Sequence, residues 1–219
     1  MPVKLLIFDL DGTLVDTRQD ITSAINYALE PYGFKKVDVD ETTKLIGEGV
    51  SRLFEKLIGN NDSDIIEDVK NRFLDYYSEH IADYSTIYPN VIETLEKLID
   101  YKKAIISNKR EELTKKLLKK INIIEYFDII VGSDTTPEKK PSPLPILYAC
   151  SNLNVQPKEA IIIGDSNYDI EAGKKAGVFK TIGVTYGYRD LIYLKDADYI
   201  ISSFDMILPI LDTFSGILI

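Results

Sequence analysis

Short apolar runs separated by helix-length segments constrain the fold of this 219-residue chain more than any other feature. Each run is long enough for one buried strand and too short for a helix that spans a membrane. The helical segments between them are the crossovers that parallel strands need, so we expect a doubly wound parallel sheet covered by helices on both faces. The runs are Val3 to Phe8, Lys103 to Ile106, Phe127 to Val131, Ala160 to Ile163 and Lys180 to Val184.

The segments between the later runs have helical periodicity and recognisable ends. Asn90 is expected to cap one helix with Glu93 three residues on, and Gly177 is expected to end another. The predicted helices are Asn90 to Asp100, Glu111 to Ile121, Leu144 to Leu153 and Tyr168 to Ala176.

Residues 16–85 interrupt the alternation, because they show helical periods alone. An insertion between the first two strands must leave and re-enter the sheet at one edge, where open α/β sheets bind ligands. We therefore predict an α/β fold with two domains: a Rossmann-like catalytic core, residues 1–15 and 86–219, and an inserted all-helical cap domain, residues 16–85.

Charge and composition exclude several classes of function. The formal net charge of −9 disfavours nucleic acids and anionic membranes as partners, because both require basic surfaces. The lone cysteine, Cys150, rules out an internal disulfide and is expected to pack in the core, and the lone histidine, His80, rules out a multi-histidine metal site. With no signal peptide or membrane helix expected, we predict a cytoplasmic monomer or homodimer that binds a small molecule.

The run Asp9-Leu10-Asp11-Gly12-Thr13 carries the strongest chemical signal. It follows a buried strand directly, and Gly12 allows a sharp turn of the backbone. One carboxylate can then attack a substrate while the other transfers a proton. We also expect Thr13 to contact the substrate.

Further polar residues follow the later strands. Ser107 and Asn108 end the second run, Asp165 follows the fourth, and Lys140 lies in a proline-rich loop after the third. In a parallel sheet these positions share one edge with Asp9, and their number and charge suit phosphoryl transfer.

Magnesium fits this set of oxygen atoms. Asp9, the backbone carbonyl of Asp11 and Asp165 could supply three hard ligands to Mg²⁺, and Asp169 could hold a bound water. Lys140 is needed to offset the carboxylates when an anionic substrate binds.

Together these residues resemble the four motifs of the haloacid dehalogenase superfamily of phosphohydrolases, in the subgroup with a helical cap after the first motif. The resemblance covers nearly the whole chain. It implies that Asp9 forms an aspartyl-phosphate, that Asp11 is the general acid and base, that Ser107 and Lys140 bind phosphate, and that Asp165 binds the metal.

Within that superfamily the chain is similar to phosphoglycolate phosphatases. The similarity rests on Asp16-Thr17, on Ile46-Gly47-Glu48-Gly49-Val50, and on the run from Gly132 to Pro141. It implies 2-phosphoglycolate as substrate, with Asn108 and Lys109 beside it. Gly47 and Gly49 in the cap, and Arg52 after them, are further candidates for binding the anion.

Other functions remain open on the same motifs. A sugar phosphatase, a phosphomutase or a pyrophosphatase would keep the whole core, although a phosphomutase would want a polar acid or base in the stretch Ile21 to Ala24. A dehalogenase would have no use for Asp11 or a metal. A phospho-receiver signalling domain would lack both Asp11 and the cap.

Overall fold

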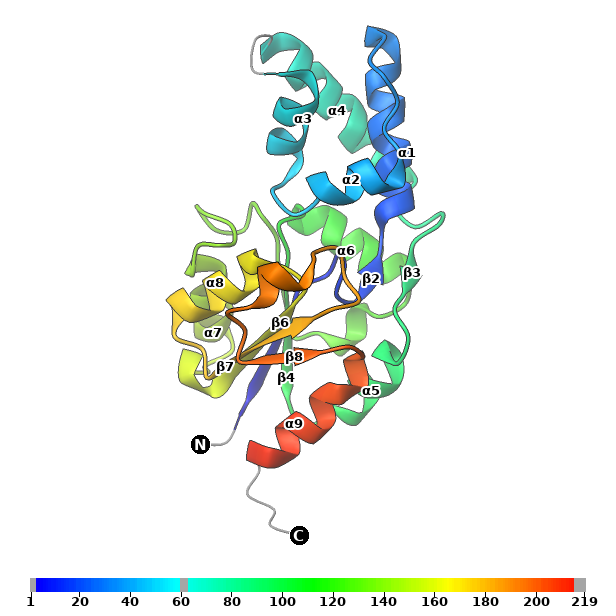
Figure 1. Ribbon diagram of the computed structural model, residues 1–219. Coiled ribbons are helices and arrows are strands. Elements are labelled where there is room, and N and C mark those ends of the chain that lie inside the picture. The colour runs from blue at the N-terminus through cyan, green and yellow to red at the C-terminus, as the bar shows by residue number, and fades with distance from the viewer. Residues whose placement is uncertain (1–2, 60–62, 215–219) are drawn as a thin grey trace.

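The computed structural model describes residues 3–59 and 63–214 and places a six-stranded parallel sheet at its centre (Figure 1). The strand order is β5-β4-β1-β6-β7-β8, with the first strand in the interior. The strands are β1 (Leu5–Phe8), β4 (Lys102–Ile106), β5 (Ile129–Val131), β6 (Ala160–Gly164), β7 (Lys180–Val184) and β8 (Tyr199–Ile201). The five predicted strands are confirmed, and the short edge strand β8 was not predicted.

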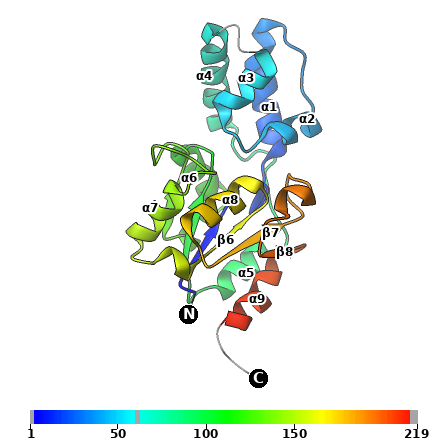
Figure 2. The same cartoon turned by 60° about the vertical axis from the view of Figure 1, so that its left-hand side comes forward.

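Alternate residues of β1 pack into separate cores on the two faces of the sheet. Leu6 and Phe8 belong to the larger core, which also takes in side chains of α5 (Val91–Lys97), α6 (Glu111–Lys120) and α9 (Ile207–Phe214). Leu5 and Ile7 belong to the other, beneath α7 (Leu144–Asn152) and α8 (Asn167–Ala176). Helices on both faces give the doubly wound core that the sequence predicted (Figure 2).

Helix ends follow the sequence signals with one exception. Gly177 ends α8 in the left-handed conformation, and Ser166 with Asp169 forms a capping box at its start. Asn90 does precede α5, but its φ of 64° turns its side chain away from the helix, and its amide donates to Ser203 and Asp205 instead. Asn90 is therefore the N-cap residue of α5, as predicted, but it does not make the side-chain hydrogen bond that usually accompanies this position.

Four helices stand above the carboxyl edge of the sheet (Figures 1 and 2). They are α1 (Arg18–Leu29), α2 (Val39–Leu45), α3 (Val50–Ile58) and α4 (Ser63–Glu79). Two antiparallel connections, β2 (Val15–Asp16) and β3 (Thr86–Ile87), join them to the sheet. The predicted domain boundaries fall at these connections. Helix α2 was not predicted.

Buried hydrogen bonds tie the two connections together. Asp20 of α1 is 2% exposed and accepts from the backbone N–H groups of Tyr84 and Ser85 and from the Ser85 hydroxyl. Because these residues lead into β3, the carboxylate fixes where both strands enter the helical region.

Single 3₁₀ turns fill several of the remaining connections. They are Glu30–Tyr32, Ile124–Tyr126, Pro157–Glu159, Leu191–Leu194 and Phe204–Met206.

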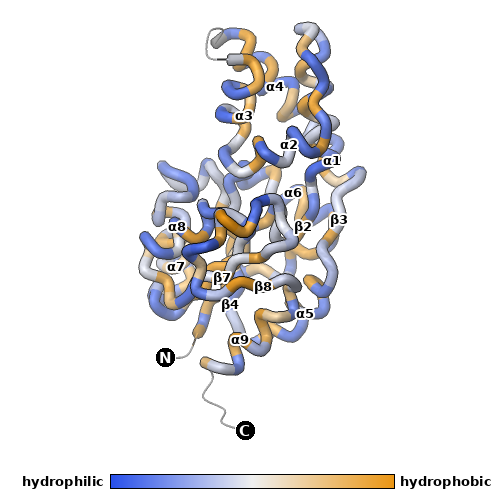
Figure 3. The backbone as a smooth tube through the Cα atoms, viewed as in Figure 1, coloured by the Kyte–Doolittle hydropathy of each residue, from blue (hydrophilic) through white to orange (hydrophobic). Residues whose placement is uncertain are grey.

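Hydrophobic residues concentrate along the strands and on the inward faces of the helices (Figure 3). Cys150 is a free, buried thiol beneath the sheet, as predicted. His80 is partly buried, stacks on Tyr76 and pairs with Asp83, as expected of a packed histidine. Within residues 3–59 and 63–214, no helix is long and apolar enough to cross a membrane.

Candidate active site

The chain makes a tight turn directly after β1, and this turn places Asp9 and Asp11 at the carboxyl edge of the sheet. The Leu10 carbonyl accepts from the backbone N–H groups of Thr13, Leu14 and Val15. Gly12 has a φ of +88°, and a Cβ there would lie 2.4 Å from Oδ2 of Asp165. Glycine is therefore required both for the turn and for the close approach of Asp165.

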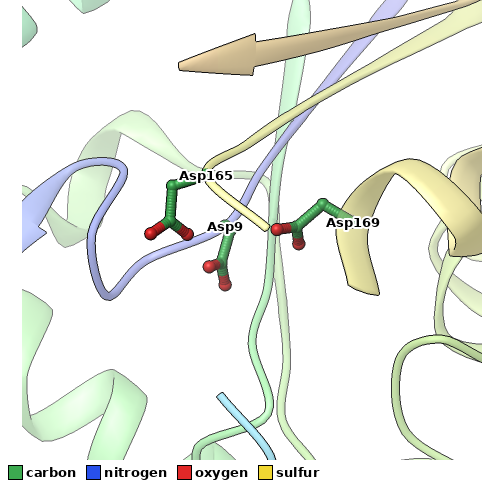
Figure 4. A group of neighbouring side chains, drawn as sticks. All are labelled: Asp9, Asp165 and Asp169. Atoms are coloured by element: carbon green, nitrogen blue, oxygen red, sulfur yellow. The ribbon is translucent and has the colours of Figure 1, made fainter. Parts of the chain in front are cut away.

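Three buried carboxylates meet at this edge. Asp9 comes from β1, Asp165 from the loop after β6 and Asp169 from the first turn of α8, and one oxygen of each lies within 4.8 Å of the others (Figure 4). Burial raises the pKa of Asp9 to about 7, with the charges of Asp169 and Asp11 adding to the rise and Lys140 opposing it. Burial, followed by the charges of Asp9 and Asp169, also raises the pKa of Asp165 well above its usual range.

This cluster fits a bound metal cation. Hard carboxylate oxygens are the ligands that Mg²⁺ and similar ions take, and a divalent charge would relieve the repulsion that raises these pKa values. Asp9 and Asp165 reach the open cavity described below, so they are the residues that would hold the ion. Asp169 is fully buried behind them.

Lys140 lies between two of the carboxylates. Its Nζ donates to Oδ1 of Asp9 at 2.8 Å, to Oδ1 of Asp169 at 2.5 Å and to the carbonyl of Ile106 at 2.6 Å. Burial alone would lower the pKa of Lys140, but Asp169 and Asp9 raise it above its ordinary value, so the side chain stays an ammonium. A fixed positive charge therefore lies beside the Asp9 carboxylate.

Asp11 has different partners from Asp9. Its Oδ1 accepts from the hydroxyl of Thr17 at 2.6 Å and from Nζ of Lys109 at 2.5 Å. The Lys109 side chain is only 8% exposed and lies over the ring of Tyr77, 5.2 Å from its centroid. Asp11 is therefore held next to a cation that comes from the loop after β4.

The polar residues after β4 reach both the sheet edge and the helical region. Ser107 is buried, and its hydroxyl accepts from the backbone N–H of Lys109 at 3.2 Å. The Asn108 amide donates to the carbonyls of Gly47 and Lys140. Asn108 thus connects the loop between α2 and α3 with the loop that carries Lys140.

A cavity of about 440 Å³ opens between the sheet edge and the four helices. Most of the residues predicted for the site line it: Asp9, Asp11, Gly47, Ser107, Asn108, Lys109, Lys140 and Asp165. Residues that are distant in the sequence therefore share one enclosure, with carboxylates and ammonium groups at its base.

Two predicted substrate contacts lie elsewhere. Thr13 is fully buried, outside the cavity lining, so it cannot touch a ligand there. The Arg52 side chain is 55% exposed and pairs with Glu55 on α3 and with Glu48 in the loop before it. The prediction that Arg52 binds the anion is therefore not supported, since its side chain points along the outer face of that helix.

Comparison with known proteins now identifies the family. Residues 6–184 match the haloacid dehalogenase-like hydrolase family. The chain belongs to this family.

Similar proteins carry a common name. A phosphoglycolate phosphatase of Aquifex aeolicus is 43% identical over 191 residues, which are 86% of this chain and 88% of that protein. One from Chromobacterium violaceum is 37% identical over 86% of this chain and 87% of its own length. The crystal structure of a predicted phosphoglycolate phosphatase from Haemophilus somnus superimposes with a TM-score of 0.89 at 33% identity, covering 95% of this chain and 97% of that one.

In this member of the haloacid dehalogenase-like hydrolases, the loop after β7 contributes residues that the motifs did not reveal. The backbone N–H of Tyr188 donates to Oδ2 of Asp165 at 2.6 Å, and its hydroxyl accepts from the N–H of Thr17 at 2.8 Å. Gly187 permits this contact, because a Cβ there would lie 2.2 Å from Cβ of Asp165. The sequence could have indicated this loop, because it follows a predicted strand and so lies at the carboxyl edge of the sheet.

Side chains of the α/β core bond to the loop between α2 and α3, which lines the cavity. Lys139 donates to the carbonyl of Glu48 at 2.6 Å, and Arg189 donates to those of Ile46 and Lys44. Gly49 lies against Lys139, whose Nζ would be 2.8 Å from a Cβ at that position. Asn108 adds a hydrogen bond to the carbonyl of Gly47. The junction of the helices and the sheet is therefore made by backbone carbonyls of this loop, and Arg52 takes no part in it.

Proposed function

We propose that this hydrolase removes phosphate from 2-phosphoglycolate, with Mg²⁺ as cofactor and Asp9 as nucleophile. The observation that carries the proposal is the pairing of two carboxylates with two different cations. Asp9 faces Lys140, which can bind the phosphoryl group, while Asp11 faces Lys109, which can bind a second anion on the substrate. The names of the relatives agree with such a substrate.

The residues divide the reaction into two displacements. An oxygen of Asp9 forms a bond to phosphorus as the bond to the leaving oxygen breaks, and Asp11 gives that oxygen its proton. A water oxygen then attacks the phosphorus of the aspartyl-phosphate and loses its proton to Asp11, which releases phosphate and restores the Asp9 carboxylate. Lys140 and Ser107 hold the phosphoryl oxygens throughout.

Magnesium bound at Asp9, Asp165 and the Asp11 carbonyl would neutralise charge on the phosphoryl group. Asp169 keeps Lys140 oriented through its 2.5 Å bond, and its other oxygen accepts from Ser166. We propose residues 16–85 as the cap, which shields the reaction from water. We also propose a cytoplasmic location, with a small phosphate ester as the substrate.

The substrate is tested by comparing 2-phosphoglycolate with ethyl phosphate, a glucose phosphate and pyrophosphate. We expect the highest kcat/KM for 2-phosphoglycolate. Replacing Lys109 with Met should raise the KM for 2-phosphoglycolate by about tenfold or more, since a charged hydrogen bond contributes about 1.5–3 kcal/mol. The KM for ethyl phosphate, which has no second anion, should change less.

Lys115→Met is the matched control, because Lys115 is exposed on α6 and pairs with Glu111. A tenfold preference for a sugar phosphate or pyrophosphate would replace 2-phosphoglycolate as the substrate and leave the phosphatase chemistry intact. Equal effects of Lys109→Met on both esters would show that Lys109 acts through Asp11 alone.

Metal binding should depend on pH through Asp9. Its raised pKa of about 7 means that it holds a proton below that pH, and Mg²⁺ must displace the proton to bind. We expect the affinity for Mg²⁺ to fall as the pH drops from about 8 to about 6, by up to about tenfold per unit. Titration calorimetry in two buffers of different ionisation enthalpy should show proton release near pH 6. Equal affinities for Mg²⁺ at about pH 8 and about pH 6 would contradict the assignment of Asp9 as a ligand.

A further inference from the structure

The cavity above Asp9 has two unlike walls. Its base is polar and carries the carboxylates and lysines of the site. The side formed by α1, α3, α4 and α6 carries an apolar wall, made of Ile21, Leu53, Phe73, Leu74, Tyr77 and Leu113. The polar side chains that α3 and α4 add to the lining are Ser51, Glu67, Lys70 and Asn71. A phosphate held at Asp9 would therefore direct its leaving group toward hydrocarbon.

The enclosure is also larger than a short hydroxy acid requires. Its volume of about 440 Å³ lies within the range of roughly 300–1,000 Å³ that is usual for sites holding drug-sized ligands. A glycolate group would leave most of the apolar wall in contact with water. Burial of that wall by a larger leaving group would be favourable.

Every lysine and arginine of the lining already has a protein partner, Arg110 pairing with Asp134, and one of them, Lys109, lies over the ring of Tyr77. Lys109 and Lys140 pair with carboxylates at the base, and Lys139 and Arg189 bond to carbonyls of the loop between α2 and α3. Lys70 of α4 lies at the rim, paired with Glu67 at 2.5 Å. The aliphatic part of the wall, Leu53, Leu74 and Leu113, thus suits an uncharged hydrocarbon group.

We propose that the enzyme hydrolyses a second class of substrate: phosphate monoesters whose leaving group is an aliphatic chain or an aromatic ring. The proposal rests on the same displacement at Asp9 as the proposed function, and the apolar wall supplies the binding. The phosphate stays at Lys140 and Ser107 while the hydrocarbon covers Leu74, Leu53 and Leu113.

The test is a series of n-alkyl phosphates with unbranched chains from ethyl to hexyl, together with benzyl phosphate and 2-phosphoglycolate. Alkyl leaving groups of similar basicity separate binding from chemical reactivity. We expect kcat/KM to rise by up to about fourfold per methylene, since each buried methylene contributes about 0.8 kcal/mol. The hexyl ester should exceed the ethyl ester by at least about tenfold.

Leu74→Asn tests the wall itself. Leu74 is half-buried on α4, and its replacement should reduce the ratio of hexyl to ethyl kcat/KM by about tenfold. Leu147→Asn is the control, because Leu147 is 38% exposed on α7, outside the cavity lining, and should leave the ratio unchanged.

The outcomes separate the two proposals. A kcat/KM that is flat or falls with chain length, with 2-phosphoglycolate still hydrolysed, overturns the second substrate class and leaves the proposed function standing. A rise with chain length that Leu74→Asn does not reduce places the hydrocarbon elsewhere and also overturns it. Turnover of the hexyl ester without turnover of 2-phosphoglycolate supports the apolar site and removes the proposed substrate.

Discussion

Asp9→Asn should abolish turnover while keeping the fold. The amide is nearly isosteric with the carboxylate but cannot attack phosphorus, and loss of a nucleophile in other covalent enzymes lowers kcat by on the order of 10⁶. The same substitution should leave the stability of the protein unchanged or raise it. Because burial raises the pKa of Asp9 to about 7, the native state is penalised for the ionised form at higher pH, and a neutral amide removes that penalty.

Two measurements on purified protein check this expectation. Phosphate release should fall to background, and the melting temperature in chelator near pH 8 should equal or exceed that of the native enzyme. Asp100→Asn is the matched control, since Asp100 is exposed before β4 and should change neither quantity. Near-native activity of Asp9→Asn would refute an aspartyl-phosphate at this residue.

The polar residues at the sheet edge could be predicted because the sequence shows where the strands end. Asp9, Ser107 and Asp165 each follow an apolar run, and parallel strands bring such ends together whatever the intervening chain does. Lys140 was harder, since it lies in a long loop. Its charge was the clue, because buried carboxylates need a counter-charge.

The pairing of Lys109 with Asp11 could not be read from the sequence. Those residues are 98 positions apart, and Tyr188 contacts Thr17 across 171 positions. Such contacts depend on how loops pack, which local periodicity does not report. The edge strand β8 was missed for a related reason, since a three-residue strand carries too little pattern to separate from a loop.

Arg52 is a different kind of error, because the sequence held the information that excludes it. Val50, Leu53 and Leu57 form the apolar stripe of α3, and Arg52 lies off that stripe. The structure places Val50 and Leu53 in the cavity lining and leaves Arg52 in solvent. The position of a residue around the helix axis therefore predicts which side chains of α3 line the cavity better than the sign of their charge does.

Lys140→Met should both inactivate and destabilise the protein. The Lys140 side chain is 3% exposed and satisfies Asp9, Asp169 and the Ile106 carbonyl together. Methionine fills the space but leaves two buried carboxylates without their cation, and breaking a buried ion pair from one side costs about 3–5 kcal/mol. Activity should fall by at least about 10²-fold, as it does when a donor to the transition state is removed.

The pH dependence separates this loss from simple misfolding. Lys140 lowers the pKa of Asp9 against the larger effect of burial, so its removal raises that pKa further. A carboxyl group with a raised native pKa destabilises the fold above its ordinary value of 3.8 and has no such effect below it. Asp9 already holds a proton below about pH 7 in the native protein, so the stability deficit of Lys140→Met in chelator should grow as the pH rises above about 7. Lys175→Met, at an exposed ion pair with Glu171, should cost about 1 kcal/mol or less at every pH.

A double variant tests whether Lys140 stabilises the fold through its pairing with Asp9. If the deficit of Lys140→Met comes from unpaired carboxylates, adding Asp9→Asn should recover part of it, because one of the two buried charges is then gone. The coupling is measured by chemical denaturation of the two single variants and the double variant in chelator near pH 8. Strictly additive effects of the two substitutions, or a deficit of Lys140→Met that does not vary with pH, would show that Lys140 stabilises the fold by packing and not through its charge.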